Sequence, residues 1–142
     1  ASDVYKRQVI IRAMIFVLVA AVAASAQEID VEDGKTLFLN SCWQCHGLDA
    51  KGFGPMAEML AIETPDLTEL SKRNGGVFPT EAVAMQIDGR SPVLAHGGEM
   101  PIFGQSLESD QNVALRMKSG QQLMTGVPLA NVIVYLESLQ TE

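Results

Sequence analysis

Two cysteines and a histidine stand together in the five-residue string CWQCH, and this string constrains the fold more than any other feature. Cys42 and Cys45 are the only two cysteines of the chain, and His46 follows the second of them at once. On a helical turn, residues three and four apart lie on the same side. Both thiols and the imidazole can therefore face one bound group, and the rest of the chain must then fold around that group.

Four kinds of site could use these residues. A disulfide suits an exported chain, a thioredoxin-like pair needs a β-α-β unit that the sequence lacks, and zinc needs two further ligands. Only His96 and carboxylates remain as such ligands. Cys-x-x-Cys-His is the attachment signature of c-type haem. We therefore predict one covalent haem c, with thioethers to Cys42 and Cys45 and with His46 bound to the iron. A thiol protein without haem is the alternative.

The second iron ligand is expected in the glycine-rich string HGGEMPIFG, which begins at His96. Pro101 disfavours helical backbone at Met100, and Gly97 and Gly98 allow the chain to fold tightly over a flat ring. Iron bound by His and Met is an electron-transfer arrangement, and the methionine raises the reduction potential. We predict Met100 as this ligand. His96 is the rival ligand, or else it hydrogen-bonds a haem propionate or a loop carbonyl. The remaining alternatives are another methionine as the ligand and an iron with an open position.

Arg90 closes the string IDGR and stands just before the methionine-containing loop. Its position allows contact with a haem propionate. The alternative is an ordinary exposed arginine.

The first 26 residues predict an export signal. An apolar segment over 13–24 ends in the small-x-small cleavage site Ala24-Ser25-Ala26. The basic stretch before this segment contains Lys6, Arg7 and Arg12. We predict a signal peptide over 1–26, a mature domain over 27–142 and a periplasmic location, with an uncleaved membrane anchor as the alternative. Residues 1–8 lack an initiator Met and are interpreted as an artefactual or truncated start.

The 142 residues suffice for one domain, and they carry a net charge of −7. A chain with this excess of acid repels nucleic acid and anionic membrane surfaces. We expect no nucleic-acid partner, and membrane contact only through partners or an uncleaved signal. The expected partners are redox proteins with a basic docking patch.

Apolar spacing and capping residues predict an all-α chain of four or five short helices, joined by long Gly/Pro loops. No strand-like alternation persists, and no internal repeat is visible. Two helices are expected to span 56–61 and 128–139. Three others are expected to begin near Asp30 or Asp33, at Pro79-Thr80, and at Ser109 or Asp110, the last of them running towards Lys118. The helix that begins at Pro79-Thr80 should end at Gly89.

Four motifs together resemble class I monohaem cytochromes c, specifically small exported bacterial ones. The resemblance covers nearly all of 30–140, and its motifs are CWQCHG over 42–47, GFGPMA over 52–57, HGGEMPIFG over 96–104 and VIVYLESLQ over 132–140. It implies the cytochrome c fold, in which short helices wrap around the haem. The segment 105–126 is longer than in the smallest members, and we expect it to form an extra helix.

The resemblance also implies roles for single residues. The carbonyl of Pro55 would accept a hydrogen bond from the imidazole of His46, which orients the ring and tunes its basicity. Gly34 and Phe38 would lie in an N-terminal helix that closely crosses the C-terminal helix, which contains Tyr135. The implied thioether and axial ligands are the same as those predicted from the residues.

The implied function is one-electron transfer by a periplasmic carrier that is not an enzyme. Two alternatives share the haem but differ in its use. One is a haem subunit of a larger oxidoreductase complex. The other is a haem protein that binds a small ligand at an open iron position.

Overall fold

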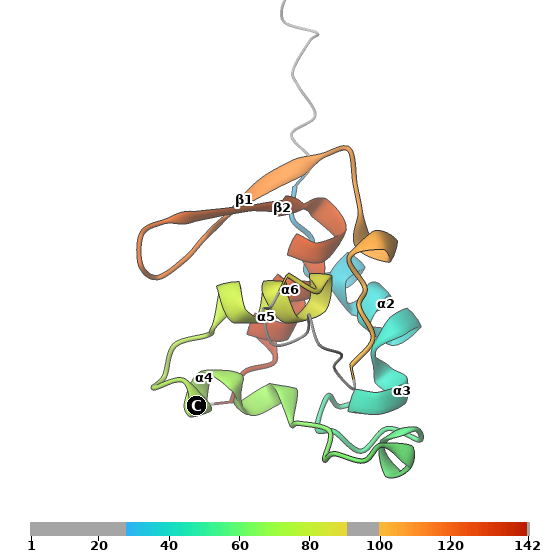
Figure 1. Cartoon of the computed structure of the whole chain (residues 1–142). Coiled ribbons are helices and arrows are strands. Elements are labelled where there is room, and N and C mark those ends of the chain that lie inside the picture. The colour runs from blue at the N-terminus through green and yellow to red at the C-terminus, as the bar shows by residue number, and fades with distance from the viewer. Residues whose placement is uncertain (1–27, 91–99, 142) are drawn as a thin grey trace, which may run out of the picture.

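The computed structural model describes residues 28–90 and 100–141 (Figure 1). The predicted signal peptide over 1–26 and the candidate ligand His96 lie outside the described residues. None of the helices in the described ranges is long and apolar enough to cross a membrane.

Short helices make up most of the regular structure. The part before residue 91 contains α2 (Val31–Ser41), α3 (Trp43–His46), the 3-10 helices η1 (Ala57–Met59) and η2 (Leu67–Glu69), α4 (Leu70–Arg73) and α5 (Thr80–Asp88). The part from residue 100 onwards contains η4 (Gln105–Leu107), the strands β1 (Asn112–Arg116) and β2 (Gln122–Gly126), and the closing helix α6 (Val127–Ser138). The described chain is therefore mainly helical, as predicted, with a small two-stranded sheet in addition.

Local signals account for the ends of the main helices. The side chain of Asp30 caps α2 by accepting hydrogen bonds from the backbone N–H groups of Glu32 and Asp33, at 2.7 and 3.1 Å. Helix α5 ends at Gly89, which adopts the left-handed conformation with φ of 81°. Helix α6 has a proline in its first turn. These three helices confirm the predictions, whereas the helix expected over 56–61 is only the single turn η1.

Helices α2 and α6 cross at very close range. A Cβ atom on Gly34 would lie 2.0 Å from the carbonyl oxygen of Asn131, so only glycine permits this approach. The rings of Phe38 and Tyr135 meet at the same crossing, with centroids 5.5 Å apart and planes at 54°. The backbone N–H of Asp30 also donates to the side-chain oxygen of Asn131 at 2.9 Å. The crossing implied by the family resemblance is thereby confirmed.

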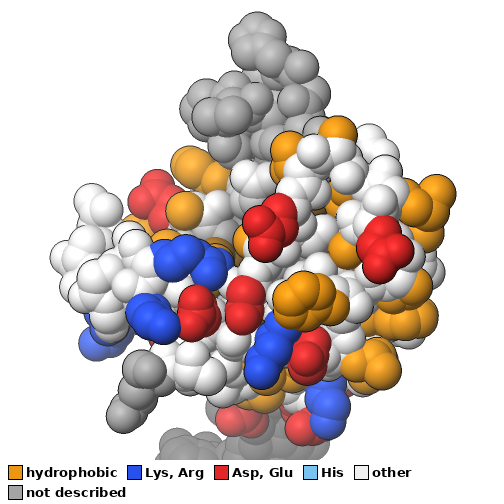
Figure 2. All heavy atoms as spheres, turned by 90° about the horizontal axis from the view of Figure 1, so that it is seen from below, with side chains coloured by type: hydrophobic (Ala, Val, Ile, Leu, Met, Phe, Trp, Pro, Cys, Tyr) orange, Lys and Arg blue, Asp and Glu red, His pale blue; other side chains and the backbone are white. Residues whose placement is uncertain are grey.

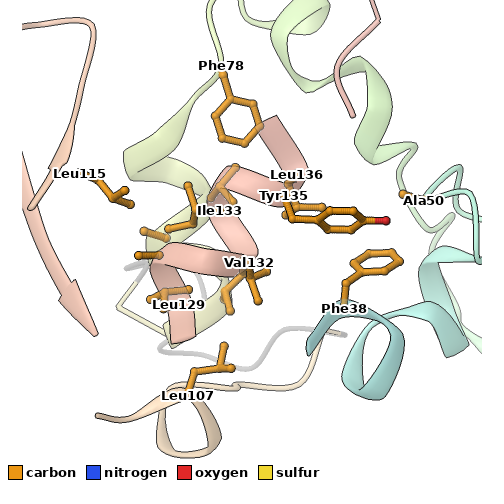
Figure 3. Close-up of a cluster of buried hydrophobic side chains, with 14 residues drawn as sticks. Phe38, Ala50, Phe78, Leu107, Leu115, Leu129, Val132, Ile133, Tyr135 and Leu136 are labelled. Atoms are coloured by element: carbon orange, nitrogen blue, oxygen red, sulfur yellow. The ribbon is translucent and has the colours of Figure 1, made fainter. Parts of the chain in front are cut away.

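The core surrounds α6, whose residues are buried along most of its length. Phe38, Val132 and Ile133 are the largest side chains with no significant exposure. Figure 3 shows Phe78, Leu107 and other apolar side chains reaching α6 from the surrounding elements. Because α6 is apolar on nearly all sides, it holds α2, α5 and the sheet together.

The segment 105–126 does not form the extra helix that we predicted. It contains the antiparallel hairpin of β1 and β2, in which Leu115 pairs with Leu123 and Val113 pairs with Thr125. These residues alternate with more exposed ones, which is the pattern of a half-buried strand. Each strand has only five residues, so the alternation is too short to stand out in the sequence. The hairpin lies at the top of Figure 1, far from α3 at the lower right.

Candidate functional site

The two cysteines and the histidine lie on one helical turn that directly follows α2. The backbone N–H of Cys42 donates to Phe38 at 2.8 Å, and the N–H of His46 donates to Cys42 at 3.0 Å. Both cysteines are free thiols and half-buried. The helical geometry predicted for CWQCH is thus present, and it puts Cys42 and His46 on the same side of the turn.

The environment of Cys42 keeps its thiol protonated. Burial raises the pKa of this thiol to about 11, and the neighbouring Cys45 adds to the increase. A thioredoxin-like pair instead needs a cysteine with a lowered pKa, because the thiolate is the attacking species. The raised pKa of Cys42 therefore does not support the redox-thiol alternative.

His46 is buried, with 8% of its surface exposed. Its Nδ1 atom lies 3.4 Å from the carbonyl oxygen of Pro65. Burial lowers the pKa of His46, although the contact with Pro65 opposes this effect. A neutral imidazole that donates from Nδ1 to a carbonyl leaves the lone pair of Nε2 free to bind a metal.

The carbonyl that contacts the imidazole belongs to Pro65. The resemblance had implied Pro55, and the structure corrects this expectation. The N–H groups of Gly54 and Met56 donate to the carbonyls of Cys45 and Gln44, at 3.0 and 2.8 Å. These bonds hold the chain around Pro55 against the backbone of α3 and leave Pro55 itself exposed. The chain reaches the ring of His46 only ten residues later. The sequence did contain a local signal at the second proline. Pro65 stands directly before Asp66, and Asp66 caps the helix that follows.

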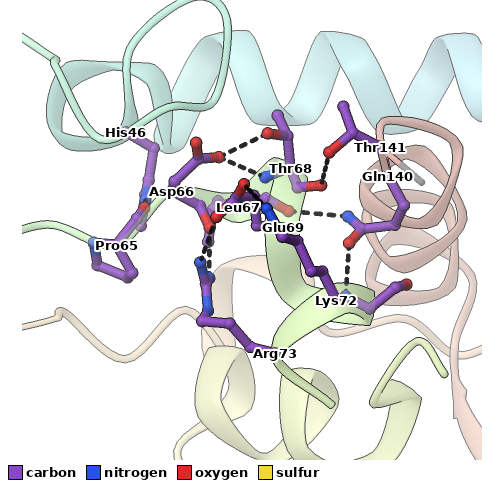
Figure 4. A network of polar contacts seen from close by, with 11 residues as sticks. His46, Pro65, Asp66, Leu67, Thr68, Glu69, Lys72, Arg73, Gln140 and Thr141 are labelled. Carbon is purple, nitrogen blue, oxygen red and sulfur yellow. Dashed lines mark hydrogen bonds and ion pairs between the residues drawn. The ribbon is translucent and has the colours of Figure 1, made fainter. Parts of the chain in front are cut away.

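A polar network fixes the segment that begins at Pro65 (Figure 4). The carboxylate of Asp66 accepts hydrogen bonds from the backbone N–H and the hydroxyl of Thr68, at 2.8 and 2.7 Å. Arg73 donates to the carbonyl of Asp66. The N–H of Leu67 donates to the carbonyl of Ala50 at 2.8 Å. The Pro65 carbonyl is therefore part of a segment held on several sides.

The residues that follow α6 contribute the long-range part of this network. The side-chain oxygen of Gln140 accepts from the N–H of Ser71 at 2.8 Å. Its nitrogen donates to the carbonyls of Leu67 and Leu136, at 2.8 and 2.7 Å. The N–H of Thr141 donates to the carbonyl of Thr68 at 3.0 Å. We did not identify Gln140 from the sequence, because its partners are about seventy residues away.

Met100 begins a segment that is anchored to the end of α5. Met100 is half-buried and packs against the same hydrophobic core as Cys42 and Trp43. The N–H of Phe103 donates to the carbonyl of Ile87 at 2.9 Å. A Cβ atom on Gly104 would lie 2.7 Å from the carbonyl oxygen of Asp88. The chain after Met100 is therefore closely packed on α5, and the role of Met100 as an iron ligand stays a prediction.

Arg90 is exposed, and its guanidinium pairs with a carboxylate of its own segment. The Nε atom lies 2.5 Å from an oxygen of Asp88, and the N–H of Arg90 donates to the other oxygen at 2.9 Å. The predicted contact between Arg90 and a propionate stays a prediction. The alternative role of His96 also stays open, since His96 lies outside the described residues.

The residues present fit a covalent haem c. Two free thiols, a neutral imidazole with one nitrogen available, and a thioether are the donors that this group uses. The hydroxyl of Thr64, next to Pro65, is buried and has no hydrogen-bond partner within 28–90 and 100–141, so it is available to donate to a polar edge of a cofactor. In the described ranges, no three His, Cys, Asp or Glu side chains are grouped to hold a metal ion. The zinc alternative therefore finds no support there.

The comparison with protein families agrees with this geometry. The family model described as Cytochrome c matches residues 31–140, which extend from the start of α2 past the end of α6. No curated protein and no solved structure matches the chain. Members of the matched family bind haem c and generally carry electrons. The match covers well over half of the chain, and the chain therefore belongs to the cytochrome c family.

Proposed function

We propose that this protein carries single electrons through one haem c, bound by thioethers to Cys42 and Cys45 and ligated by His46 and Met100. The observation that carries the proposal is the environment of His46. A buried, neutral imidazole is held by the Pro65 carbonyl on Nδ1, one residue after two free thiols. This combination leaves Nε2 as the ligating atom.

Haem c supplies a reversible one-electron couple when it is bound. The role of the chain is to hold that couple in one geometry. The Pro65 carbonyl keeps the imidazole in one tautomer and orientation, and the polar network holds Pro65 in turn. Met100, on a segment packed against α5, would hold the haem iron together with His46, and a substrate would then have no part in its ligation. An electron carrier needs little structural change between its two oxidation states, and these fixed ligands suit that need.

We further propose that the protein works in the periplasm after removal of residues 1–26. The basic stretch, the apolar segment and the Ala-Ser-Ala site support export. Attachment of c-type haem also takes place outside the cytoplasm. A protein held permanently in an oxidoreductase complex would share the same haem chemistry, and isolation of a stable hetero-oligomer from the native source would favour that assignment.

Optical spectroscopy tests the proposal. The full chain should be expressed with a haem-maturation system, together with Met100→Ala and the control Met124→Ala, which changes an exposed methionine on β2. We expect a haemochrome spectrum of the two-thioether type and a far-red band of ferric iron bound by methionine, lost only in Met100→Ala. A colourless product would refute haem binding. Rapid binding of carbon monoxide by the unmodified protein would instead indicate a ligand-binding haem protein.

A further inference from the structure

Large apolar side chains are exposed on the loop that follows the cysteine-containing turn. Five of the nine large hydrophobic side chains exposed among the described residues belong to the segment 48–62. They are Leu48, Phe53, Met56, Met59 and Ile62, with exposed fractions of 69, 84, 41, 76 and 56%. We call this segment the apolar loop. Such a concentration on a surface marks a contact site more often than isolated exposed residues do.

The apolar loop is built onto α3 by backbone hydrogen bonds. The N–H groups of Gly52, Gly54 and Met56 donate to the carbonyls of His46, Cys45 and Gln44, at 2.8, 3.0 and 2.8 Å. Both glycines are buried, and a Cβ on Gly54 would lie 2.3 Å from the carbonyl oxygen of Gln44. Phe53 is therefore held between two anchored glycines. A partner that covers these side chains would lie against the turn that bears the cysteines.

The apolar loop has the same sign of charge as the whole chain. The segment 48–62 contains Asp49, Lys51 and Glu58, for a net charge of −1, and the chain carries −7. Figure 2 shows hydrophobic side chains gathered towards the right of the face that is seen from below, the side on which α2 and α3 lie. The loop is therefore an apolar area with a small acidic surplus, on a molecule that is acidic as a whole.

We propose that the apolar loop is the docking surface for a redox protein whose contact face is apolar at its centre and basic at its rim. This inference rests on the proposed function in electron transfer. The acidic surplus of the chain disfavours a second copy and an anionic membrane, because like charges repel. A basic rim complements that surplus, and an apolar centre with a polar rim is the usual anatomy of a protein interface. The apolar centre sets the affinity, while the charges mainly speed the encounter.

The test uses the haem-loaded full chain and an electrode that imitates the partner. The probe is a gold electrode coated with a mixed methyl- and ammonium-terminated monolayer, and an all-ammonium monolayer serves as the charge-only surface. The loop variant is Phe53→Ser with Met59→Ser. The control is Met124→Ser, which removes an exposed methionine, at 57% against 76% for Met59, from β2. The bound, electroactive protein is measured from the reversible voltammetric wave as the protein concentration is raised.

On the mixed monolayer, we expect the loop variant to need about tenfold more protein for half-saturation, because it buries less apolar surface. On the all-ammonium surface, the three proteins should bind equally. Equal half-saturation of the loop variant and the unmodified protein on the mixed monolayer would overturn the proposal. An equal weakening by Met124→Ser would overturn it as well.

Two further outcomes would replace the proposed partner. Loop-dependent sedimentation with neutral phosphatidylcholine vesicles would indicate a lipid surface. A dimer that dissociates in the loop variant would indicate a second copy. The proposed function fails separately, since it predicts a haem spectrum and a reversible wave for the unmodified protein on either monolayer.

Discussion

The Nδ1 atom of His46 lies 3.4 Å from the carbonyl oxygen of Pro65, nineteen residues further along the chain. This contact connects the cysteine-containing turn to a segment that is also supported by the C-terminal residue Gln140. A hydrogen bond to the remote nitrogen of a metal-binding histidine sets the orientation and the basicity of the ring. The supports of Pro65 are therefore predicted to matter for both stability and ligand geometry.

Gln140→Ala should loosen this segment. The substitution removes three hydrogen bonds and leaves the Ser71 N–H and the Leu67 carbonyl without their side-chain partner. We expect the free energy of unfolding to fall by about 1–3 kcal/mol, as is typical when buried polar groups lose their partners. Urea denaturation of the haem-loaded protein measures this change. The control Gln122→Ala alters an exposed glutamine on β2 and should leave the midpoint unchanged; equal midpoints for both variants would contradict the role of Gln140.

The stabilising contribution of the Asp66 carboxylate should be lost in acid. The hydrogen bond from the Thr68 hydroxyl is the main cause that lowers the pKa of Asp66, and Lys51 and Arg73 act in the same direction. A lowered pKa in the folded state stabilises the fold above the pKa of an unfolded Asp, about 3.9. This contribution is lost as the pH falls through the lower, folded pKa.

The variant Asp66→Asn checks this dependence. At neutral pH it should unfold at lower urea concentration than the unmodified protein, and the difference should shrink at pH values below that of an unfolded Asp. Asp110→Asn on the surface serves as the control. A difference that stays constant across the acid range would show that Asp66 acts through shape and not through its charge.

Gly34→Ala should separate α2 from α6. A Cβ at this position would overlap the Asn131 carbonyl oxygen at 2.0 Å and approach the Cβ of Tyr135 at 2.9 Å. Both partners belong to a packed helix, so we expect a loss of about 3 kcal/mol. The neighbouring variant Lys35→Ala removes only a surface ion pair and should cost less than about 0.5 kcal/mol. Equal midpoint temperatures of thermal unfolding for the two variants would refute the close crossing of α2 and α6.

Cys42→Ala combined with Cys45→Ala should prevent stable folding. A domain of this size has a modest core, and a covalent haem would add a large apolar centre to it. We expect the double variant to lose the cooperative thermal transition measured by circular dichroism. Each single variant keeps one thioether site and should retain a weakened transition. A cooperative transition of unchanged midpoint in the double variant would mean that the chain folds without the attached group.

Much of the fold follows from short-range signals. Asp30 caps α2, Gly89 ends α5, and a proline opens α6. The helical turn of CWQCH is equally local, because its hydrogen bonds join residues three and four apart. The hairpin was missed for the opposite reason. Its strands are short, and only the packing of residues such as Leu115 against the core makes their alternation meaningful.

The sequence by itself therefore determined the helical turn that bears Cys42, Cys45 and His46, the helical class of the fold and the glycine at the helix crossing. Tertiary structure alone decided that Pro65, and not Pro55, meets the imidazole, and that Gln140 holds the Pro65 segment. It also decided that the side chains of the apolar loop point outward. The physical reason is the distance along the chain over which each interaction acts. Capping and helical spacing act between neighbours, whereas the partner of a buried imidazole depends on how a long loop closes over packed helices.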